Sequence, residues 1–496
     1  MDFERFPLQI QPYLLPQPSG SLGYDCLKCG SRLGPERLYY TCPSCGGLLM
    51  LTDGEEGRLK QNPGSFWRDL FDYRLLLNHQ ALRGVFTFHE FLAPLIPLED
   101  IVFLGEAHTP LVRAPEDLER EIGSNFYVKL DGLNPSASFK DRGMAAALSY
   151  VKYLARTQKT GTIMALCAST GDTSAAAALY SASLGGIVKS AVLLPKGYVT
   201  PQQLSQPLGA GATVFELPGV FDDCMKVVEY LSDNYQVVLL NSKNPWRVLG
   251  QESYAYEVAQ QFDYDLAGKV VFVPVGNAGN ITAILSGFLK FYRAEVITTL
   301  PKIVAVQSER ANPVFLYYQK PPDTRKYTPV KVKPSVAQAA MIGDPVSFPR
   351  LAKLAQEFSS LGGSFQVVEV KEEGIMEAMI QANRKGLTIC TQGGEALAGL
   401  KVAKALGIVL DSEISIIDST AHALKFMEFQ NGYFAGSLAK DYGIESKREY
   451  LNSPQELDLG SIPRPSRDHT LTPEEHGVFV KEASLLIAKA LGLHKN

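Results

Sequence analysis

Four of the seven cysteines are crowded into one short stretch near the start of the chain, where they have the spacing of a metal site. They follow the pattern C-x2-C-x12-C-x2-C, and a glycine comes directly after each pair. Two residues between cysteines allow both sulfurs to point at one tetrahedral ion, and the glycines permit the tight turn. Four thiolates leave no open position for water or substrate, so we expect a closed structural zinc site. Its ligands are Cys26, Cys29, Cys42 and Cys45.

The residues around these cysteines limit the alternatives. The same stretch holds three basic and two acidic residues: Lys28, Arg32, Arg37, Asp25 and Glu36. This charge is too weakly basic for a nucleic-acid module, which leaves a zinc ribbon or a ribbon that has lost its metal. The other cysteines stand in apolar or helical surroundings and are expected to be buried packing residues: Cys167, Cys224 and Cys390.

Lys140 is the second candidate for chemistry. It lies in the polar, turn-forming stretch LNPSASFKDRGM, ahead of an alanine-rich helix expected from about residue 142. A lysine near a helix N-terminus lacks the favourable partner of a C-terminal position, and desolvation lowers its pKa further. The neutral amine is a nucleophile suited to Schiff-base chemistry. The alternative is a surface lysine paired with Asp141.

Two glycine-containing loops are candidate anion sites. The loop VGNAGNIT joins an expected strand at 270–275 to a helix from about Ile281, so backbone amides and the helix dipole face a ligand. It lacks the patterns of dinucleotide and triphosphate loops, and a plain glycine turn is the alternative. The hydroxyls of ASTGDT at 168–173 bind an anion or merely cap the following helix.

The elements that position these residues follow a regular alternation. From about residue 120, short β-rich runs alternate with helical stretches, first around 163–239 and again around 270–417. This alternation is typical of parallel sheets with crossover helices, so we expect an α/β fold with two open, mainly parallel sheets and a cleft between them. A (β/α)8 barrel is the structural alternative, but the long irregular segment 308–364 interrupts the repeats.

Ligands bind beyond the carboxyl ends of strands in open parallel sheets. Three loops have that position, at 168–173, 276–280 and 418–422, and we expect all three to face one cavity.

Composition excludes several functional classes. The 496 residues include 48 Lys and Arg against 52 Asp and Glu, for a formal net charge of −4. This balance gives no global positive field for nucleic acid or an anionic membrane. No run approaches the ~18 apolar residues of a membrane span, and the start MDFERFPLQIQPYLLP lacks signal-peptide regions. We therefore expect a cytoplasmic protein without nucleic-acid or membrane partners.

Six segments together carry a family resemblance. In chain order they are PSASFKDRG at 135–143, ASTGDTSAAA at 168–177, NSKNPWRVLGQES at 241–253, PVGNAGN at 274–280, IGDPVSFPRL at 342–351 and STAHALKF at 419–426. They resemble threonine synthase, in the fold-type-II group of pyridoxal-phosphate enzymes, and the likeness covers most of the chain. The lysine, GNAGN and TAH segments mark the group, whereas NSKNPWR and IGDPVSFP point to threonine synthase. The N-terminal ribbon is similar to that of some members.

The resemblance implies a set of cofactor contacts. Lys140 is the lysine that binds pyridoxal 5′-phosphate covalently, Phe139 packs near its ring, and Thr420 meets its pyridine nitrogen. A hydroxyl there, unlike a carboxylate, does not hold a proton on the ring, which weakens the electron sink. Asp172 falls beside the 3′-oxygen, where many members have asparagine. The phosphate cradle comprises Gly276, Asn277, Ala278, Gly279 and Asn280.

The reaction implied is conversion of O-phosphohomoserine and water to threonine and phosphate. The dianionic phosphate needs a cationic fork, which Arg247 supplies. The free amine of Lys140 shuttles protons between the α and β carbons. Neutral donors for the substrate phosphate are Asn241, Ser242 and Thr173, and those for its carboxylate are Ser169, Thr170 and Gly171.

Departures from the family pattern leave alternatives open. GEAHTPL at 105–111 stands where the family has G-E-G-N-T-P-L, and we expect His108 to pack or hydrogen-bond. His422 is expected to be a structural hydrogen-bonding residue. A related enzyme such as cysteate synthase or threonine deaminase would keep Lys140 without needing a phosphate fork at Arg247. A rival of another class is a non-catalytic protein that keeps the cofactor only as a structural element.

The expected organisation has five parts. They are a zinc ribbon at 20–55, a helical connector at 56–104, a large cofactor-binding domain at 105–144 and 263–445, a small α/β domain at 145–262, and a tail at 446–496. The final helix is expected to start at Thr472-Pro473-Glu474-Glu475, a capping box with proline at its first position. A homodimer is an expectation from the family resemblance.

Overall fold

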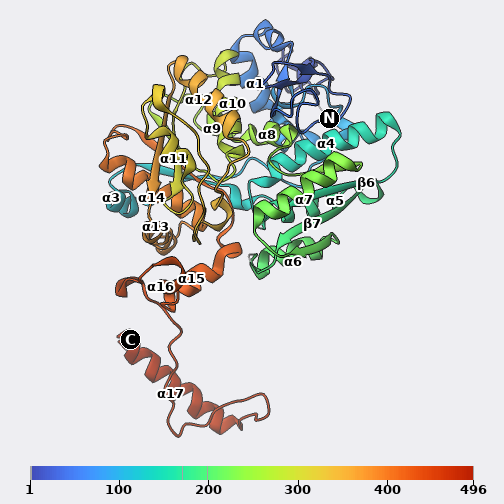
Figure 1. Ribbon diagram of the computed structural model, residues 1–496. Helices are drawn as coiled ribbons and strands as arrows, with labels where there is room; N and C mark the ends of the chain where they lie inside the picture. Colours follow the sequence, from blue (N-terminus) through green and yellow to red (C-terminus); the bar gives the residue numbers. More distant parts are fainter. Residues whose placement is uncertain (1–2, 170, 198, 495–496) are drawn as a thin grey trace. The chain divides into compact units, whose positions relative to one another are not determined.

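The computed structural model describes residues 3–169, 171–197 and 199–494 (Figure 1). The chain divides into two compact units, Met1–Glu445 and Ser446–Asn496. The first unit contains three sheets, and the strands of the largest sheet come from before and after those of the four-stranded sheet in the sequence.

The first sheet is a small antiparallel ribbon near the N-terminus. Its strands pair in the order β2-β1-β3, and they are β1 (Leu22–Cys26), β2 (Arg32–Leu33) and β3 (Leu49–Asp53). The helices α1 (Gly64–Leu75) and α2 (His89–Leu92) follow it, together with 3-10 segments at 56–61, 80–82, 85–88 and 98–100. The aromatic side chains of this connector are core residues, as expected, since Trp67 and Phe71 are buried. Phe71 stacks on Phe291 of the main body, with the ring centroids 5.9 Å apart.

The second sheet has four parallel strands in the order β8-β7-β6-β9. They are β6 (Ile163–Ala168), β7 (Val188–Pro195), β8 (Thr213–Leu217) and β9 (Val237–Leu239). The connecting helices are α5 (Asp172–Ala182), α6 (Pro201–Gly209) and α7 (Phe221–Asn234). The chain therefore moves outward from β6 to β8 and then crosses back to β9, on the other side of β6.

The third sheet has six strands in the order β12-β11-β10-β13-β5-β4, and only β4 is antiparallel to its neighbour. Its strands are β4 (Leu111–Arg113), β5 (Phe126–Leu130), β10 (Lys269–Pro274), β11 (Lys302–Ser308), β12 (Ser364–Val370) and β13 (Ile414–Ser419). The two open, mainly parallel sheets predicted from the alternation are confirmed. The segment 308–364 is less irregular than expected, because α11 (Pro313–Tyr318) and α12 (Phe348–Ser360) lie within it.

Both parallel sheets contain a topological switch point. In the four-stranded sheet it lies between β6 and β9, and in the six-stranded sheet between β10 and β13. Crossover helices leave these strand pairs in opposite directions, so a crevice opens beyond their carboxyl ends. The segments that leave β6, β10 and β13 are the three loops that the sequence analysis singled out.

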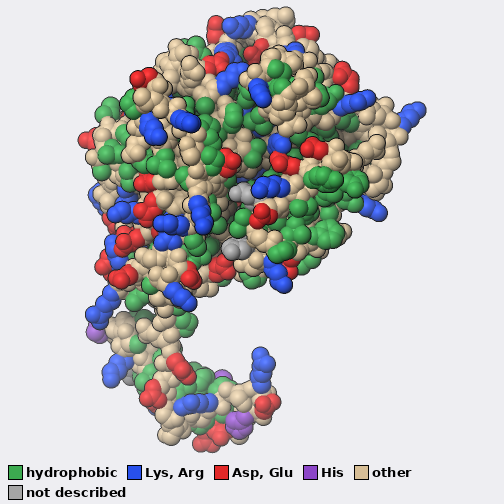
Figure 2. All heavy atoms as spheres, viewed as in Figure 1, with side chains coloured by type: hydrophobic (Ala, Val, Ile, Leu, Met, Phe, Trp, Pro, Cys, Tyr) green, Lys and Arg blue, Asp and Glu red, His purple; other side chains and the backbone are tan. Residues whose placement is uncertain are grey.

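The remaining helices complete the first unit. They are α3 (Glu116–Ile122), α4 (Lys140–Gln158), α8 (Pro245–Gln251), α9 (Ser253–Gln261), α10 (Gly279–Arg293), α13 (Glu372–Arg384), α14 (Thr391–Ala405), α15 (Met427–Phe434) and α16 (Ala439–Tyr442). Helix α4 begins at Lys140 itself, two residues before its expected start. No described helix is long and apolar enough to cross a membrane. On the face drawn in Figure 2, basic and acidic side chains are interspersed.

The second unit contains α17 (Pro473–Leu491). Its start is the predicted capping box, because the Thr472 hydroxyl accepts from the Glu475 amide and the Glu475 carboxylate accepts from the Thr472 amide. None of its described residues is buried.

Candidate active site

Loops from both switch points line one pocket in the first unit. The predicted residues that line it are Phe139, Lys140, Ser169, Asp172, Thr173, Asn241, Ser242, Arg247, Gly276, Asn277, Ala278, Gly279, Asn280 and Thr420. Gly171 stands just outside this described lining, as the N-cap residue of α5. Thr170 lies outside the described residues. The structure thus brings together side chains that are up to 281 positions apart, from Phe139 to Thr420.

Lys140 has the electrostatic environment of a neutral amine. Burial, together with the positive charge of Arg247, lowers its pKa to about 7, and Asp172 only partly opposes this. Its Nζ atom lies 4.1 Å from the centroid of the Phe139 ring. The alternative of a surface lysine paired with Asp141 does not hold, because the Asp141 carboxylate accepts from the backbone amide and the hydroxyl of Ser136. Lys140 is therefore available to a ligand in the pocket.

The turn before Lys140 is fixed against the loop after β13. The Phe139 amide donates to the Thr420 carbonyl at 2.9 Å, and the His422 amide donates to the Ala137 carbonyl at 3.0 Å. His422 is also a structural hydrogen-bonding residue, since its Nδ1 accepts from the Leu424 amide. These contacts hold Lys140 and Thr420 in the same part of the pocket.

A buried ionic network anchors the first turn of α4. Arg142 pairs with Asp131 at 2.8 Å and also with Glu257, while Lys129 pairs with Glu257 at 2.8 Å, and all four side chains are fully buried. Burial alone would destabilise such charges, but each has an opposite partner within hydrogen-bonding distance. His108 lies beside this network and shares a hydrogen bond of 2.9 Å with Thr87, the structural role expected for it.

The loop between β10 and α10 forms a cradle. Ala278 has a left-handed backbone with φ +59° and is the N-cap residue of α10, which has no side-chain cap among the described residues. A Cβ added at Gly276 would lie 2.9 Å from the Ala340 Cα, so only glycine fits there. Asn280 donates to Asp418 at 2.8 Å, while its buried Oδ1 has no described partner. Free amides at a helix start suit a phosphate-bearing ligand, whereas the Asn280 oxygen can only accept from a donor.

Arg247 is a buried cation without an acidic partner among the described residues. Its Nη1 donates to the Leu240 carbonyl at 2.9 Å, and its buried Nε has no partner. Burial lowers its pKa to about 10. An unpaired guanidinium facing a pocket is costly unless an anion binds there. The arrangement therefore supports an anionic ligand next to Lys140.

Three of the predicted substrate contacts already have internal partners, and one of them is Ser242, whose hydroxyl accepts from the Asn277 side chain at 3.2 Å. The Asn241 Oδ1 accepts from the Ala168 amide at 2.9 Å, and the Asn241 Nδ2 donates to the Ala168 carbonyl at 2.6 Å. The Ser169 hydroxyl oxygen accepts from the amides of Gly171 and Ser174, so it caps α5. The capping alternative for ASTGDT is thus present in the structure, and only the Ser169 hydroxyl proton remains for a ligand.

Some residues that line the pocket, or contact its lining, were missed by the sequence analysis. Gln392 and Gln251 contribute to the lining, and both polar atoms of the buried Gln392 amide lack a described partner. Lys425 forms an ion pair of 3.0 Å with Asp172. Gln251 and Lys425 lie in the segments 241–253 and 419–426 that carry the family resemblance, but their roles depend on contacts between distant segments and were not assigned.

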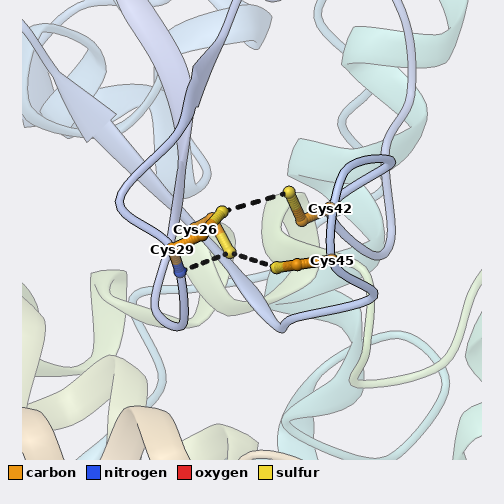
Figure 3. Close-up of side chains that lie close together, drawn as sticks. All are labelled: Cys26, Cys29, Cys42 and Cys45. Atoms are coloured by element: carbon orange, nitrogen blue, oxygen red, sulfur yellow. Dashed lines mark hydrogen bonds between the residues drawn. The ribbon is translucent and has the colours of Figure 1, made fainter.

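The four N-terminal cysteines meet at one point (Figure 3). Their four sulfur atoms all lie within 4.8 Å of one another. The Cys26 and Cys45 sulfurs are 3.5 Å apart, and the amides of Lys28 and Cys29 face the Cys26 sulfur. Gly30 and Gly46 have φ of +73° and +67°, as expected for the two tight turns. Four convergent thiols with backbone amides around them fit a tetrahedral zinc ion.

The ribbon is joined directly to elements of the pocket. Trp246, which precedes Arg247, donates to the Tyr24 hydroxyl at 2.8 Å. Arg350 donates to the Leu49 carbonyl of β3 at 2.7 Å and to the Ser242 carbonyl at 2.9 Å. The ribbon therefore buries the outer side of α8 and supports the loop before it.

We expect Cys26→Ser to lower stability far more than catalysis. Loss of one thiolate ligand would weaken the binding of a zinc ion by this cluster, which should cost about 3 kcal/mol and lower the Tm. Metal content and thermal unfolding measure this, with Cys224→Ser as the matched control at a buried cysteine outside the cluster. A Cys26→Ser protein that keeps one zinc ion per chain and the parental Tm would contradict the zinc assignment.

A family model and individual relatives of known function agree on the family of this chain. The family model described as pyridoxal-phosphate dependent enzyme matches residues 102–416. The threonine synthase of Methanocaldococcus jannaschii is 36% identical over 407 residues, which cover 81% of this chain and 92% of that protein. Threonine synthase 2, chloroplastic, of Arabidopsis thaliana is 34% identical over 397 residues, which cover 80% of this chain and 75% of that protein.

Solved structures agree at the level of the fold. The structure of threonine synthase from Escherichia coli superimposes with a TM-score of 0.60 at 19% identity, covering 87% of this chain and 93% of that chain. The threonine synthase of Brucella melitensis, described as bound to PLP, superimposes with a TM-score of 0.58 at 17% identity and covers 86% of this chain and 92% of that chain.

Proposed function

Because the chain belongs to the threonine synthase family of pyridoxal-phosphate-dependent enzymes, we propose that it is a lyase that converts O-phosphohomoserine and water to L-threonine and phosphate. One observation carries the phosphate-specific part of the proposal. The unpaired guanidinium of Arg247 lines the same pocket as Lys140, whose amine has a lowered pKa. A phosphorylated amino acid is a substrate that uses both groups.

The chain's own residues fit pyridoxal 5′-phosphate. The uncapped start of α10 and the lowered pKa of Lys140 are the observations that support this fit. The cofactor, when bound, supplies an electron sink for negative charge at the substrate carbons. Lys140 would hold its aldehyde carbon, Phe139 would pack near its ring, and Thr420 would meet the ring nitrogen. The cradle 276–280 would hold its phosphate, and Asp172 would lie beside its 3′-oxygen.

The substrate would be held at both of its charged ends. Arg247 would bind the phosphate with Ser242 and Thr173, while Asn241 positions the end of β6. The carboxylate would accept hydrogen bonds from residues 169–171. This arrangement leaves the substrate's α and β carbons beside Lys140.

Lys140 would move the protons of the reaction. Its Nζ atom, free once substrate is bound, takes a proton from one substrate carbon and returns it to another. The bond from the γ carbon to the phosphate oxygen breaks, and the phosphate leaves with that oxygen. Water then adds its oxygen to the β carbon, so one water is consumed for each phosphate released. A pKa of about 7 allows the amine to act as both base and acid near neutral pH.

A substrate panel distinguishes this function from its neighbours. We expect turnover with O-phosphohomoserine, none with unphosphorylated homoserine, and at most slow loss of added L-threonine. The physical reason is the positive charge of Arg247, which has no anion to bind when the substrate lacks a phosphate. Rapid consumption of L-threonine, without phosphate release from O-phosphohomoserine, would favour a deaminase instead.

The pH dependence of cofactor capture tests the state of Lys140. Only the neutral amine attacks an aldehyde, so cofactor-free protein should bind pyridoxal phosphate faster as pH rises through about 7, and the rate should then level off. Removing the positive charge of Arg247 raises the pKa of Lys140, so Arg247→Gln should move the midpoint to higher pH. Stopped-flow absorbance measures both rates, and a midpoint near that of free lysine would contradict the buried-amine account.

The remaining parts of the proposal concern the zinc ribbon, location and assembly. The four cysteines would hold a structural zinc ion that stabilises the ribbon and takes no part in the reaction. We also propose a cytoplasmic location, and we infer a homodimer from the family resemblance. Light scattering of the purified protein tests the assembly.

A further inference from the structure

Asp172 is the only carboxylate among the described residues that line the pocket. It is the first residue of α5, and its side chain is only 4% exposed. The proposed ligands of this pocket carry two phosphate groups and a carboxylate. A lone buried carboxylate would repel all of them, so its charge needs compensation.

Lys425 supplies an opposite charge at hydrogen-bonding distance. Its Nζ atom lies 3.0 Å from Asp172 Oδ1, and its side chain is also 4% exposed. The side-chain amide of Gln203 donates to the same oxygen at 3.3 Å. No hydrogen bond from a described residue falls on Oδ2. The two donors therefore fix the carboxylate by one oxygen and leave the other for the pocket.

The contact joins the two halves of the site. Lys425 lies in the 3-10 turn Ala423–Phe426, after β13 of the six-stranded sheet, whereas Asp172 follows β6 of the four-stranded sheet. Thr200, the N-cap residue of α6, reinforces this bridge. Its hydroxyl donates to the Lys425 carbonyl at 3.1 Å and accepts from the backbone amide of Gln203 at 3.2 Å. The same capping box therefore fixes both partners of Asp172.

We propose that Lys425 is a positioning residue of this enzyme: it holds Asp172 across the two sheets and provides the countercharge that allows a carboxylate to stand in the pocket. The proposal rests on the proposed function for the identity of the anionic ligands. Lys425 and Asp172 have one joint role in this proposal. Together they form an ion pair without net charge, which takes the place of an uncharged side chain in the pocket. Neither charge should be tolerated without the other.

The charges around Lys140 support the role of Lys425 and Asp172 as a pair. Four charged groups act on its amine from different elements: Arg247, Asp172, Lys425 and Asp418. Asp172 raises the pKa of Lys140 and Lys425 lowers it, so the two contributions oppose each other. Losing Lys425 alone would leave the Asp172 contribution unopposed and make Lys140 harder to deprotonate.

A double-mutant cycle tests the proposal with two readouts. The variants are Lys425→Met, Asp172→Asn and the double variant, and the control is Lys385→Met, which removes a surface lysine paired with Asp117. The first readout is the affinity for pyridoxal phosphate, measured from its visible absorption without any substrate. The second is the split between KM and kcat with O-phosphohomoserine. If no variant or wild-type protein releases phosphate, the proposed function fails, and the cofactor readout still tests the ion pair.

We expect each single variant to weaken cofactor binding and raise KM by about tenfold or more, since it leaves a buried charge unpaired. The double variant should be less defective than either single variant, because both charges are removed together and no buried charge is left unpaired. If Lys425→Met alone does not fold, Asp172→Asn is compared with the double variant instead. Adding Lys425→Met to Asp172→Asn should then strengthen the binding of pyridoxal phosphate. A double variant that is as defective as the sum of its singles would overturn the proposal.

Discussion

Lys140→Ala should abolish turnover while leaving the fold intact. Among the described residues that line the pocket, Lys140 is the one amine, and its pKa is lowered to about 7; in our account it carries both the covalent link to the cofactor and the proton transfers. Loss of a positioned acid–base group alone costs about 10² to 10⁴ in rate, and loss of the covalent link adds to this. Phosphate release and the visible spectrum of the bound cofactor measure the two consequences.

The control for this variant lies on the same helix. Lys152 is also in α4, where its Nζ donates to the Glu99 carbonyl rather than facing the pocket. Lys152→Ala should keep the activity and the visible band of the parent protein. Circular dichroism should show that both variants are folded, because Lys140 forms no ion pair among the described residues. Wild-type activity in Lys140→Ala would refute the mechanism.

Arg247→Ala should raise KM for O-phosphohomoserine by about 10- to 100-fold, the value of a lost charge-assisted contact. Cofactor content should change much less, because the cradle 276–280 belongs to another element. The guanidinium has one backbone partner, the Leu240 carbonyl, so its removal leaves little of the protein unpaired.

Arg247→Lys separates charge from shape. Lysine keeps the positive charge but loses the planar fork that binds phosphate with two hydrogen bonds, so its KM should lie between those of wild type and Arg247→Ala. Steady-state kinetics with equal cofactor loading makes the comparison. An unchanged KM, with loss of cofactor instead, would place Arg247 at the cofactor rather than at the substrate.

Much of the fold was predictable because its signals are local. Alternating β-rich and helical runs gave both parallel sheets, and the cysteine spacing with its glycines gave the ribbon knuckles. The helix in 348–360 was missed, since proline and serine at its start resemble the preceding irregular segment. The strand order, and hence the two switch points, follows from pairing between distant segments that no local pattern encodes.

The lining of the pocket was predictable where residues lie in recognisable motifs, as for Lys140, Asn280 and Thr420. It was not predictable where a side chain's role depends on a distant partner. Lys425 matters through Asp172, which is 253 positions away in the sequence. Asn241 matters through the Ala168 backbone, which uses the amide that had been assigned to substrate.

The most direct test of the central claim is turnover of O-phosphohomoserine in water enriched in oxygen-18, with both products measured by mass spectrometry. Our account predicts equal amounts of phosphate and L-threonine, with one labelled oxygen in the threonine hydroxyl and none in the phosphate. This pattern requires cleavage between the γ carbon and oxygen followed by addition of water at the β carbon. Labelled phosphate together with homoserine, or no threonine at all, would contradict the account.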